Sequence, residues 1–120
     1  MDWIVEFYKE VNEREPVKVF LNSLSTDARA KVVKVINMLS DYGVLLKEPY
    51  TRQIRGKIRE LRIKDSHGAI RVLYFTCTGK RFILLHGFIK KTEKTPVREI
   101  ELAEKRMKDF INREERTHED

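Results

Sequence analysis

The sequence predicts an α+β fold, in which an N-terminal strand and a two-helix hairpin pack on a twisted antiparallel sheet and a helix ends the chain. Three observations carry this prediction. A β-branched and aromatic run opens the chain, apolar residues then recur at helical spacing, and strand-like segments separated by short turns follow. With 120 residues, 41% of them hydrophobic, the chain can bury one modest core.

The first third of the chain is expected to form one strand and two helices. Residues 3–8, WIVEFY, have the composition of a strand. Pro16 suits the first turn of a short amphipathic helix. The Ser-Thr-Asp run at 25–27 is an N-cap cluster that opens a longer helix, and Gly43 is a natural end for it. The apolar residues of both helices fall on one side, so we expect the hairpin to cover a sheet.

The remainder of the chain is expected to supply the sheet and a last helix. Residues 44–56 contain Pro and Gly and predict a loop or short turn. Three strand-like segments, joined by the turn-like links DSHG and TG as in a meander, lie at residues 57–64, 69–77 and 81–89. Residues 95–96, Thr-Pro, begin the last helix. We expect one domain over residues 1–113 and a frayed tail over 114–120, which have nothing apolar to bury.

Positive charge is concentrated in the middle of the sequence. Residues 47–98 hold 14 Lys/Arg against 4 Asp/Glu, whereas residues 1–46 hold 6 against 7 and residues 99–120 hold 5 against 8. The net charge of +6 therefore comes from a basic centre between mildly acidic ends. Such a distribution favours a polyanionic partner, and RNA is the first hypothesis.

Composition argues against several other classes of protein. Cys77 is the only cysteine, which excludes an intramolecular disulfide and a cysteine-based zinc site. The N-terminus is acidic where a signal peptide is basic, and no apolar run approaches membrane-spanning length, so we expect a soluble, cytoplasmic protein with no membrane partner. The chain contains no HExxH motif, no cluster of metal-ligand residues and no glycine-rich phosphate loop, so we expect no metal and no cofactor.

Strand alternation assigns the candidate site residues to faces of the sheet. In the segment 57–64, Glu60, Arg62 and Lys64 point to one side. Arg71 interrupts the apolar run of the next segment, and we expect it to lie near Arg62 on the neighbouring strand. Regular alternation in the last segment predicts a shared face for Phe82, Leu84, His86, Phe88 and Lys90.

The run Leu84–Pro96, LLHGFIKKTEKTP, leads an apolar strand directly into a group of lysines. Cations delivered to one place before a helix suit the binding of phosphates. The candidate RNA-binding residues are Lys57, Arg59, Lys64, Lys90 and Lys94. For most of the other cations in the basic centre, such as Lys47, Arg52 and Arg55, a solvated surface position is the simpler interpretation.

These motifs resemble a known family. The segments ELRI at 60–63 and RVLY at 71–74, the run LLHGFIKKTEKTP and the helix EIELAEKRMKDF are similar to phage-derived HigB-type toxins of the RelE/ParE superfamily. The resemblance covers nearly the whole chain. It implies two N-terminal helices on an antiparallel sheet and a toxin of a type II toxin–antitoxin system. It further implies three partners: mRNA, the ribosome and a small antitoxin, often of the helix-turn-helix type.

The resemblance also implies roles for individual residues. RelE-like toxins place cations at alternate positions of one strand, an arginine on the next and a basic pair after the last. The matching residues here are Arg62 and Lys64, Arg71, and Lys90 with Lys91. Glu60 departs from the RelE branch, which has a lysine at that position, and the last helix lacks the tyrosine that some relatives have at its start.

The leading hypothesis is an endoribonuclease that cuts mRNA through attack of the RNA 2′-OH on the adjacent phosphate. The candidate catalytic residues are Glu60, Arg62, Arg71, Lys91 and His86. The cations would neutralise charge on the phosphate. Glu60 would be the base, although an ion pair with an arginine explains it equally well, and Lys90, Lys91 or His86 would be the acid. For His86, a hydrogen-bonded core position is the simpler interpretation.

Two alternatives stay open at this point. The same fold would serve a ParE-like inhibitor that binds DNA gyrase without catalysis. A plain RNA- or ribosome-binding module would bind with a steep salt dependence and leave transcripts whole. The group of cations after LLHGF favours the ribonuclease, because a gyrase inhibitor has no need of it.

Overall fold

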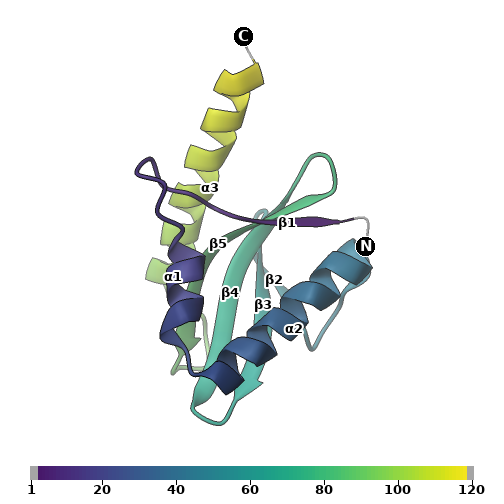
Figure 1. Cartoon of the computed structure of the whole chain (residues 1–120), viewed down its shortest axis with the longest axis vertical. Coiled ribbons are helices and arrows are strands. Elements are labelled where there is room, and N and C mark those ends of the chain that lie inside the picture. Colours follow the sequence, from purple (N-terminus) through teal and green to yellow (C-terminus); the bar gives the residue numbers. More distant parts are fainter. Residues whose placement is uncertain (1–2, 119–120) are drawn as a thin grey trace.

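A five-stranded mixed sheet in the order β1-β5-β4-β3-β2 forms the centre of the computed structural model, which describes residues 3–118 (Figure 1). The strands are β1 (Ile4–Phe7), β2 (Thr51–Arg55), β3 (Ile58–Asp65), β4 (Gly68–Cys77) and β5 (Arg81–Lys90). The helices are α1 (Pro16–Ser23), α2 (Thr26–Tyr42) and α3 (Val97–His118), and a 3-10 turn, η1 (Gly43–Leu45), follows α2. The predicted α+β class is confirmed.

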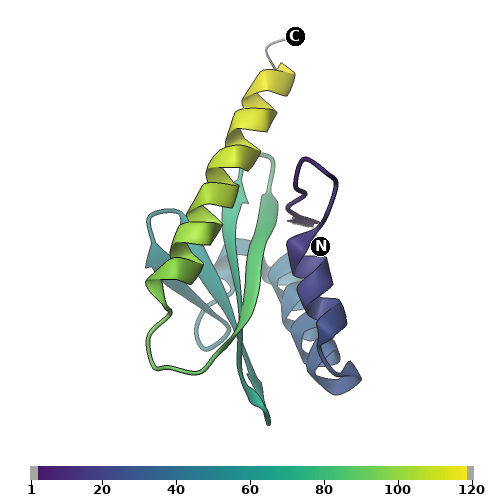
Figure 2. The ribbon, with the colours of Figure 1, turned by 90° about the vertical axis from the view of Figure 1, so that its left-hand side faces the viewer.

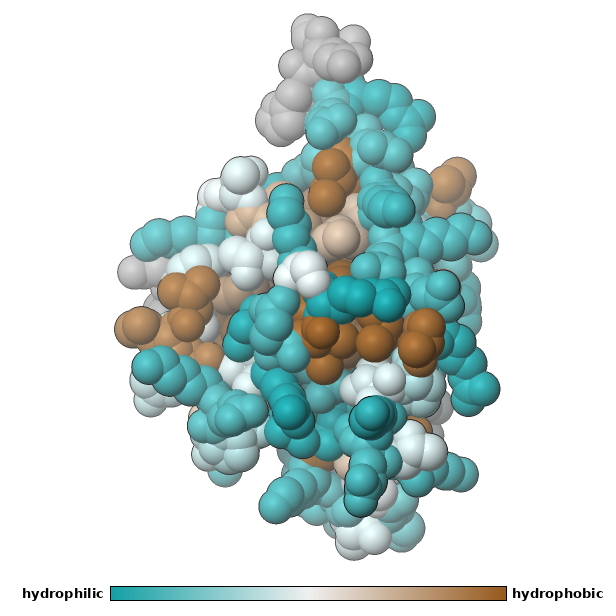
Figure 3. Space-filling view, turned by 180° about the vertical axis from the view of Figure 1, so that it is seen from behind, coloured by the Kyte–Doolittle hydropathy of each residue, from teal (hydrophilic) through white to brown (hydrophobic). Residues whose placement is uncertain are grey.

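Helices cover both faces of the sheet and create two cores (Figure 2). On one face, α1 and α2 bury residues such as Val17 and Val32 against Leu61 and Val72 of the sheet. On the other face, Ala103 of α3 packs in a second cluster with sheet residues that include Leu73, Phe75 and Ile83. The surface seen from behind is largely hydrophilic, and apolar side chains show there in separate patches (Figure 3). Within residues 3–118, no helix has the length and apolar character needed to cross a bilayer.

Local signals in the sequence set the ends of the helices. Pro16 occupies the start of α1, where its missing N–H costs nothing. The Ser25 hydroxyl accepts a hydrogen bond from the Ala28 N–H at 3.2 Å and so caps α2. Gly43 ends α2 at a φ of 58°, and a side chain there would collide with the ring of Trp3. These three positions agree with the prediction from sequence.

Two strands differ from the prediction. β1 runs parallel to β5, so the sheet is mixed and not purely antiparallel. The chain between β1 and β5, which comprises α1, α2 and the strands β2 to β4, provides the long connection that a parallel pairing requires. Residues 51–55, expected within a loop, form β2, which pairs antiparallel with β3 at the edge of the sheet. Four of its five residues are at least partly exposed, so β2 lacks the apolar alternation by which a half-buried strand is recognised.

A bulge in β5 overturns the predicted sharing of one face by Phe82, Leu84, His86, Phe88 and Lys90. Leu73 pairs with His86 while the next residue, Tyr74, pairs with Leu84, so Leu85 is an extra residue in β5. The bulge reverses the alternation that follows it. Phe82 and Leu84 therefore belong to the core under α1 and α2, whereas Phe88 belongs to the core under α3.

The last helix is longer than expected. α3 continues to His118 and so includes part of the segment predicted as a tail. Arg81 of β5 explains some of this order, because its guanidinium bonds both Glu6 of β1 and Glu114 of α3 at 2.5 Å. Residues 119–120 of the predicted tail lie outside the described residues.

Candidate functional site

Three rows of side chains cross the sheet on the face where α3 packs. From β3 through β4 to β5, the rows are Glu60, Leu73 and His86; Arg62, Arg71 and Phe88; and Lys64, Ala69 and Lys90. Neighbouring strands are about 5 Å apart, so residues in one row touch or nearly touch. Register thus gathers two arginines and two lysines beside one carboxylate.

Arg62 and Arg71 form the centre of this cluster. The Arg62 N–H points away from β4 and donates to the Tyr50 carbonyl at 2.8 Å, so Arg62 and Arg71 form a non-hydrogen-bonded pair. In such a pair the side chains are closest, with Cα atoms about 4.5 Å apart. Two like charges at this separation repel each other, and a nearby counter-charge is needed to offset that repulsion. Glu60 supplies it.

Glu60 is buried, with 1% of its surface exposed, and both of its carboxylate oxygens are engaged. Oε1 lies 3.3 Å from Nε of Arg71 and 3.7 Å from Nε of Arg62. Oε2 accepts a hydrogen bond of 2.6 Å from the Thr95 hydroxyl, which reaches over from the segment between β5 and α3. The structure therefore contains the ion pairs expected under one interpretation of Glu60, with Arg71 and Arg62. These pairs explain the position of Glu60 without a catalytic role.

Arg71 is almost as buried as Glu60 but is less well satisfied. Its Nη1 donates to the Ile70 carbonyl at 3.0 Å, and its Nε makes no hydrogen bond within the described residues despite its short contact with Glu60. Burial lowers the pKa of Arg71, Glu60 opposes that effect and Arg62 adds to it. A buried guanidinium with spare donors is suited to an anion that approaches along the sheet face.

Lys90 ends the third row and belongs to the same electrostatic cluster. Burial lowers the pKa of its ammonium group from the ordinary value. Glu60 opposes this shift, whereas Arg71 and Arg62 reinforce it. Lys90 therefore gives up its proton more readily than an exposed lysine does, which favours it as a proton donor.

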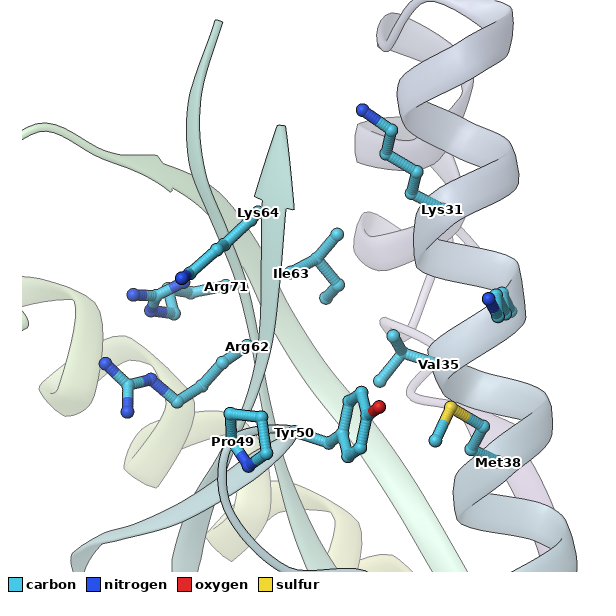
Figure 4. Close-up of a pocket in the computed structure, with 10 residues that line it drawn as sticks. Lys31, Val35, Met38, Pro49, Tyr50, Arg62, Ile63, Lys64 and Arg71 are labelled. Carbon is cyan, nitrogen blue, oxygen red and sulfur yellow. The ribbon is translucent and has the colours of Figure 1, made fainter. Parts of the chain in front are cut away.

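A pocket of about 500 Å³ extends from these cations to helix α2 (Figure 4). In Figure 4, Arg62, Lys64 and Arg71 lie on one side of β3, whereas Tyr50, Val35 and Met38 lie on the side of α2. The complete lining is Lys31, Lys34, Val35, Met38, Pro49, Tyr50, Arg62, Ile63, Lys64 and Arg71. The side formed by β3 and β4 is thus cationic, and the side formed by α2 combines the apolar Val35 and Met38 with Lys31 and Lys34.

His86 is held at both ring nitrogens. Nδ1 is 3.3 Å from Nη1 of Arg106, and Nε2 is 3.0 Å from Oε1 of Glu99. Because arginine can only donate, Nδ1 accepts and Nε2 carries the proton that is donated to Glu99. Burial lowers the pKa of His86, Glu99 opposes the shift and Arg106 adds to it. The ring also stacks on Phe88. The structure therefore agrees with the interpretation of His86 as a hydrogen-bonded residue.

The other candidate residues are divided between the cluster and more distant positions. Lys91 and Lys94 are exposed in the segment that Thr95 ties to Glu60. Lys57 lies at the opposite end of β3, where it lines a different pocket with Cys77 and Glu114. Arg59 faces the other side of the sheet and donates to Gln53 and Thr51. The structure does not bring Lys57 and Arg59 to the cluster.

Three residues of this region were not predicted from the sequence. The sequence predicts Thr95 only as the start of a helix, and nothing in it links Thr95 to Glu60. The lysines of α2, Lys31 and Lys34, lie outside the basic centre and join the pocket only through the packing of α2 on β3. Within the described residues, no three His, Cys, Asp or Glu side chains are grouped so that they would hold a metal ion.

Residues 19–108, three quarters of the chain, match the model of a protein family described as phage derived protein Gp49-like (DUF891). The chain belongs to this family. Gp49-like proteins are associated with RelE-like toxins of toxin–antitoxin systems, which indicates an antitoxin as a partner. The matched region of this Gp49-like chain contains the whole cluster, from Glu60 to Thr95. No curated protein matches the chain.

Proposed function

We propose that this Gp49-like chain is the HigB-like toxin of a type II toxin–antitoxin system within the RelE/ParE superfamily. In this proposal it is an endoribonuclease that cuts mRNA, on the ribosome, and so blocks translation. The observation that carries the proposal is the meeting of Arg62, Arg71 and Lys90 around the buried carboxylate of Glu60. Family membership supports the toxin part of the proposal, and the chemistry of the cluster supports the ribonuclease part.

Binding of RNA would begin with an exchange of anions. Glu60 occupies the arginines in the free protein at 3.3 and 3.7 Å. A phosphate offers more acceptor oxygens than a carboxylate and suits the fork of a guanidinium, so it would compete for Arg62 and Arg71. Each arginine that turns to the phosphate frees Oε1 of Glu60. The scissile group would thus bring about the release of its own base.

The chemical step then follows from the positions of the residues. The 2′-OH attacks phosphorus while its proton passes to Glu60, and the bond from phosphorus to the 5′-oxygen breaks. Lys90 donates a proton to that oxygen, which gives a 2′,3′-cyclic phosphate and a 5′-OH end. Arg62, Arg71 and Lys91 neutralise the charge that develops on the phosphorane. Water returns the proton from Glu60 to the Lys90 amine.

Lys90 is preferred over the alternative acids for physical reasons. Both ring nitrogens of His86 are bonded, to Glu99 and Arg106, so this side chain positions α3 against β5. Lys91 is exposed and serves as a cation. Lys64 and Lys94 would bind flanking phosphates, and the ribosome would align the mRNA, which lowers the demand on the isolated site.

The test is to map the 5′ ends of cellular transcripts minutes after induction of the chain. The variant is Arg62→Ala/Arg71→Ala, and the matched control is Lys57→Ala/Arg59→Ala, which removes two cations of β3 and its turn from outside the cluster. Fluorescence of Trp3 verifies that both fold. We expect cuts within translated frames from the native chain and the control and none from the variant. Growth arrest with intact transcripts and an induced DNA damage response would instead support a gyrase inhibitor.

A further inference from the structure

Tyr50 presents an aromatic ring at the surface beside the cluster. It lies between η1 and β2, and 39% of its surface is exposed. Within residues 3–118, its ring stacks on no other aromatic ring and its hydroxyl makes no hydrogen bond. An exposed ring without such partners is free to stack on a planar group of a ligand.

The backbone fixes Tyr50 next to Arg62. The Tyr50 carbonyl accepts a hydrogen bond of 2.8 Å from the Arg62 N–H, and the Tyr50 N–H donates to the Lys47 carbonyl at 3.0 Å. The next residue, Thr51, begins β2 and pairs with Leu61. Both backbone groups of Tyr50 are therefore bonded, so the backbone that carries the ring is held in place before a ligand arrives. Such preorganisation lowers the entropy that is lost on binding.

One pocket joins this ring to the arginines of the cluster. Its volume is about 500 Å³, and Tyr50 lines it together with Arg62 and Arg71 (Figure 4). Val35 and Met38 of α2 add apolar surface on the side of the ring. The Arg71 side chain is only 8% exposed, and its Nε makes no hydrogen bond within the described residues. Spare guanidinium donors on one side and an aromatic ring on the other suit a ligand that combines an anion with a flat, apolar group.

A nucleotide has this combination, because a single ribose joins its phosphate to its base. We propose that Tyr50 stacks on the base of the nucleotide immediately 5′ of the scissile phosphate, while Arg62 and Arg71 hold that phosphate. The inference rests on the proposed ribonuclease function and names a residue that positions the substrate. The attacking 2′-OH belongs to the same nucleotide, so holding its base and its 3′-phosphate would restrict the ribose between them and orient the attack. Stacking accepts any base, so this subsite positions RNA without reading its sequence.

The test uses deoxydinucleotides, which have a single internucleotide phosphate and no 2′-OH to attack it. Three of them are titrated into the chain at low salt and followed by NMR: one with both bases, one without the 5′ base and one without the 3′ base. We expect the native chain to bind about tenfold more weakly when the 5′ base is absent. Equal binding with and without the 5′ base, or a loss confined to removal of the 3′ base, would overturn the proposal. Failure of the complete dinucleotide to bind would do the same.

Variants of the chain separate stacking from charge and from folding. Tyr50→Phe keeps the ring and should retain the difference of about tenfold that removal of the 5′ base causes, whereas Tyr50→Ala should reduce it to less than about twofold. Lys34→Met removes a cation from the same pocket and should weaken binding of both ligands alike. Trp3 fluorescence verifies folding, and Tyr50→Leu replaces Tyr50→Ala if that variant does not fold. A tenfold difference that persists without the ring would leave Tyr50 a purely structural role and refute the stacking.

Methyl signals locate the base within the molecule. The ring current of the bound 5′ base should shift the methyl signal of Met38, which lines the pocket, and leave that of Met107 in the core under α3 unchanged. An unmoved Met38 signal would overturn the placement. Transcript cleavage by the native chain is scored separately. Binding that depends on the 5′ base and Tyr50, without cleavage, would remove the ribonuclease and leave the nucleotide pocket; cleavage without that dependence would remove only the pocket.

Discussion

Removal of the Glu60 carboxylate should destabilise the chain by about 3 kcal/mol. Glu60 is the carboxylate that pairs with Arg71 among the described residues, and only 7% of Arg71 is exposed. Breaking a buried pair on one side costs about 3–5 kcal/mol, because the remaining charge stays buried without a partner. Arg62 is more exposed and regains water, so we take the lower end of that range for Glu60→Ala. With a urea m-value of about 2 kcal/mol per M, the midpoint should fall by about 1.5 M.

Trp3 provides the assay, because it is the only tryptophan and stacks on Phe82 at 4.7 Å. It lies in the core under α2, on the opposite face from Glu60, so its fluorescence follows global unfolding. The control is Glu60→Leu/Arg71→Leu, which replaces the pair by apolar groups and should unfold within about 1 kcal/mol of the native chain. It should not cut RNA. A native midpoint for Glu60→Ala, or a double variant as unstable as the single one, would refute the argument.

Three further predictions concern the acid, the histidine and the threonine. Lys90→Arg keeps the charge but not a readily transferable proton, so the rate of single-turnover RNA cleavage should fall by about 100-fold while RNA binding is unchanged. A cleavage rate within about threefold of that of the native chain would exclude Lys90 as the acid. Because burial lowers the pKa of His86 from 6.5, its stabilising contribution is complete above about pH 6.5 and is lost as pH falls through the lower folded value. Urea midpoints between about pH 5 and 8 should therefore depend less on pH in His86→Asn than in the native chain, and an unchanged slope would contradict this. Thr95→Val should lower stability by about 1 kcal/mol in urea titrations and slow cleavage several-fold, since Glu60 loses its hydroxyl donor; native values for both would contradict a supporting role.

Local chemistry accounts for what the sequence predicted well. Pro16, the Ser-Thr-Asp cap at 25–27 and Gly43 act within one turn of themselves, so their effects are visible in a short window. The apolar spacing of α1, α2 and α3 likewise follows from a single helical period. Pairing is different, because it joins distant residues. Neither the parallel contact of β1 with β5 nor the edge position of β2 has a signature inside the strand itself.

The candidate site shows the same division. Alternation along β3 placed Glu60, Arg62 and Lys64 on one side, and the structure agrees. The same alternation places Arg59 on the opposite face, away from the cluster. The prediction of Arg59 as an RNA-binding residue followed the total charge of the segment and not this alternation. The bulge at Leu85 could not be predicted from the sequence, because it is defined only by the register of β5 against β4.

The bulge has a consequence for the cluster. Without it, His86 and Phe88 would face α1 and α2, and β5 would contribute neither of them to the α3 face. Because the extra residue reverses alternation after Leu84, the end of β5 delivers Lys90 beside Arg71 and Arg62. The position of Lys90 in the cluster therefore depends on one irregular residue of β5. A deletion of Leu85 would preserve every charge in the chain and turn Lys90 away from Glu60, Arg62 and Arg71, which are held together by β3 and β4.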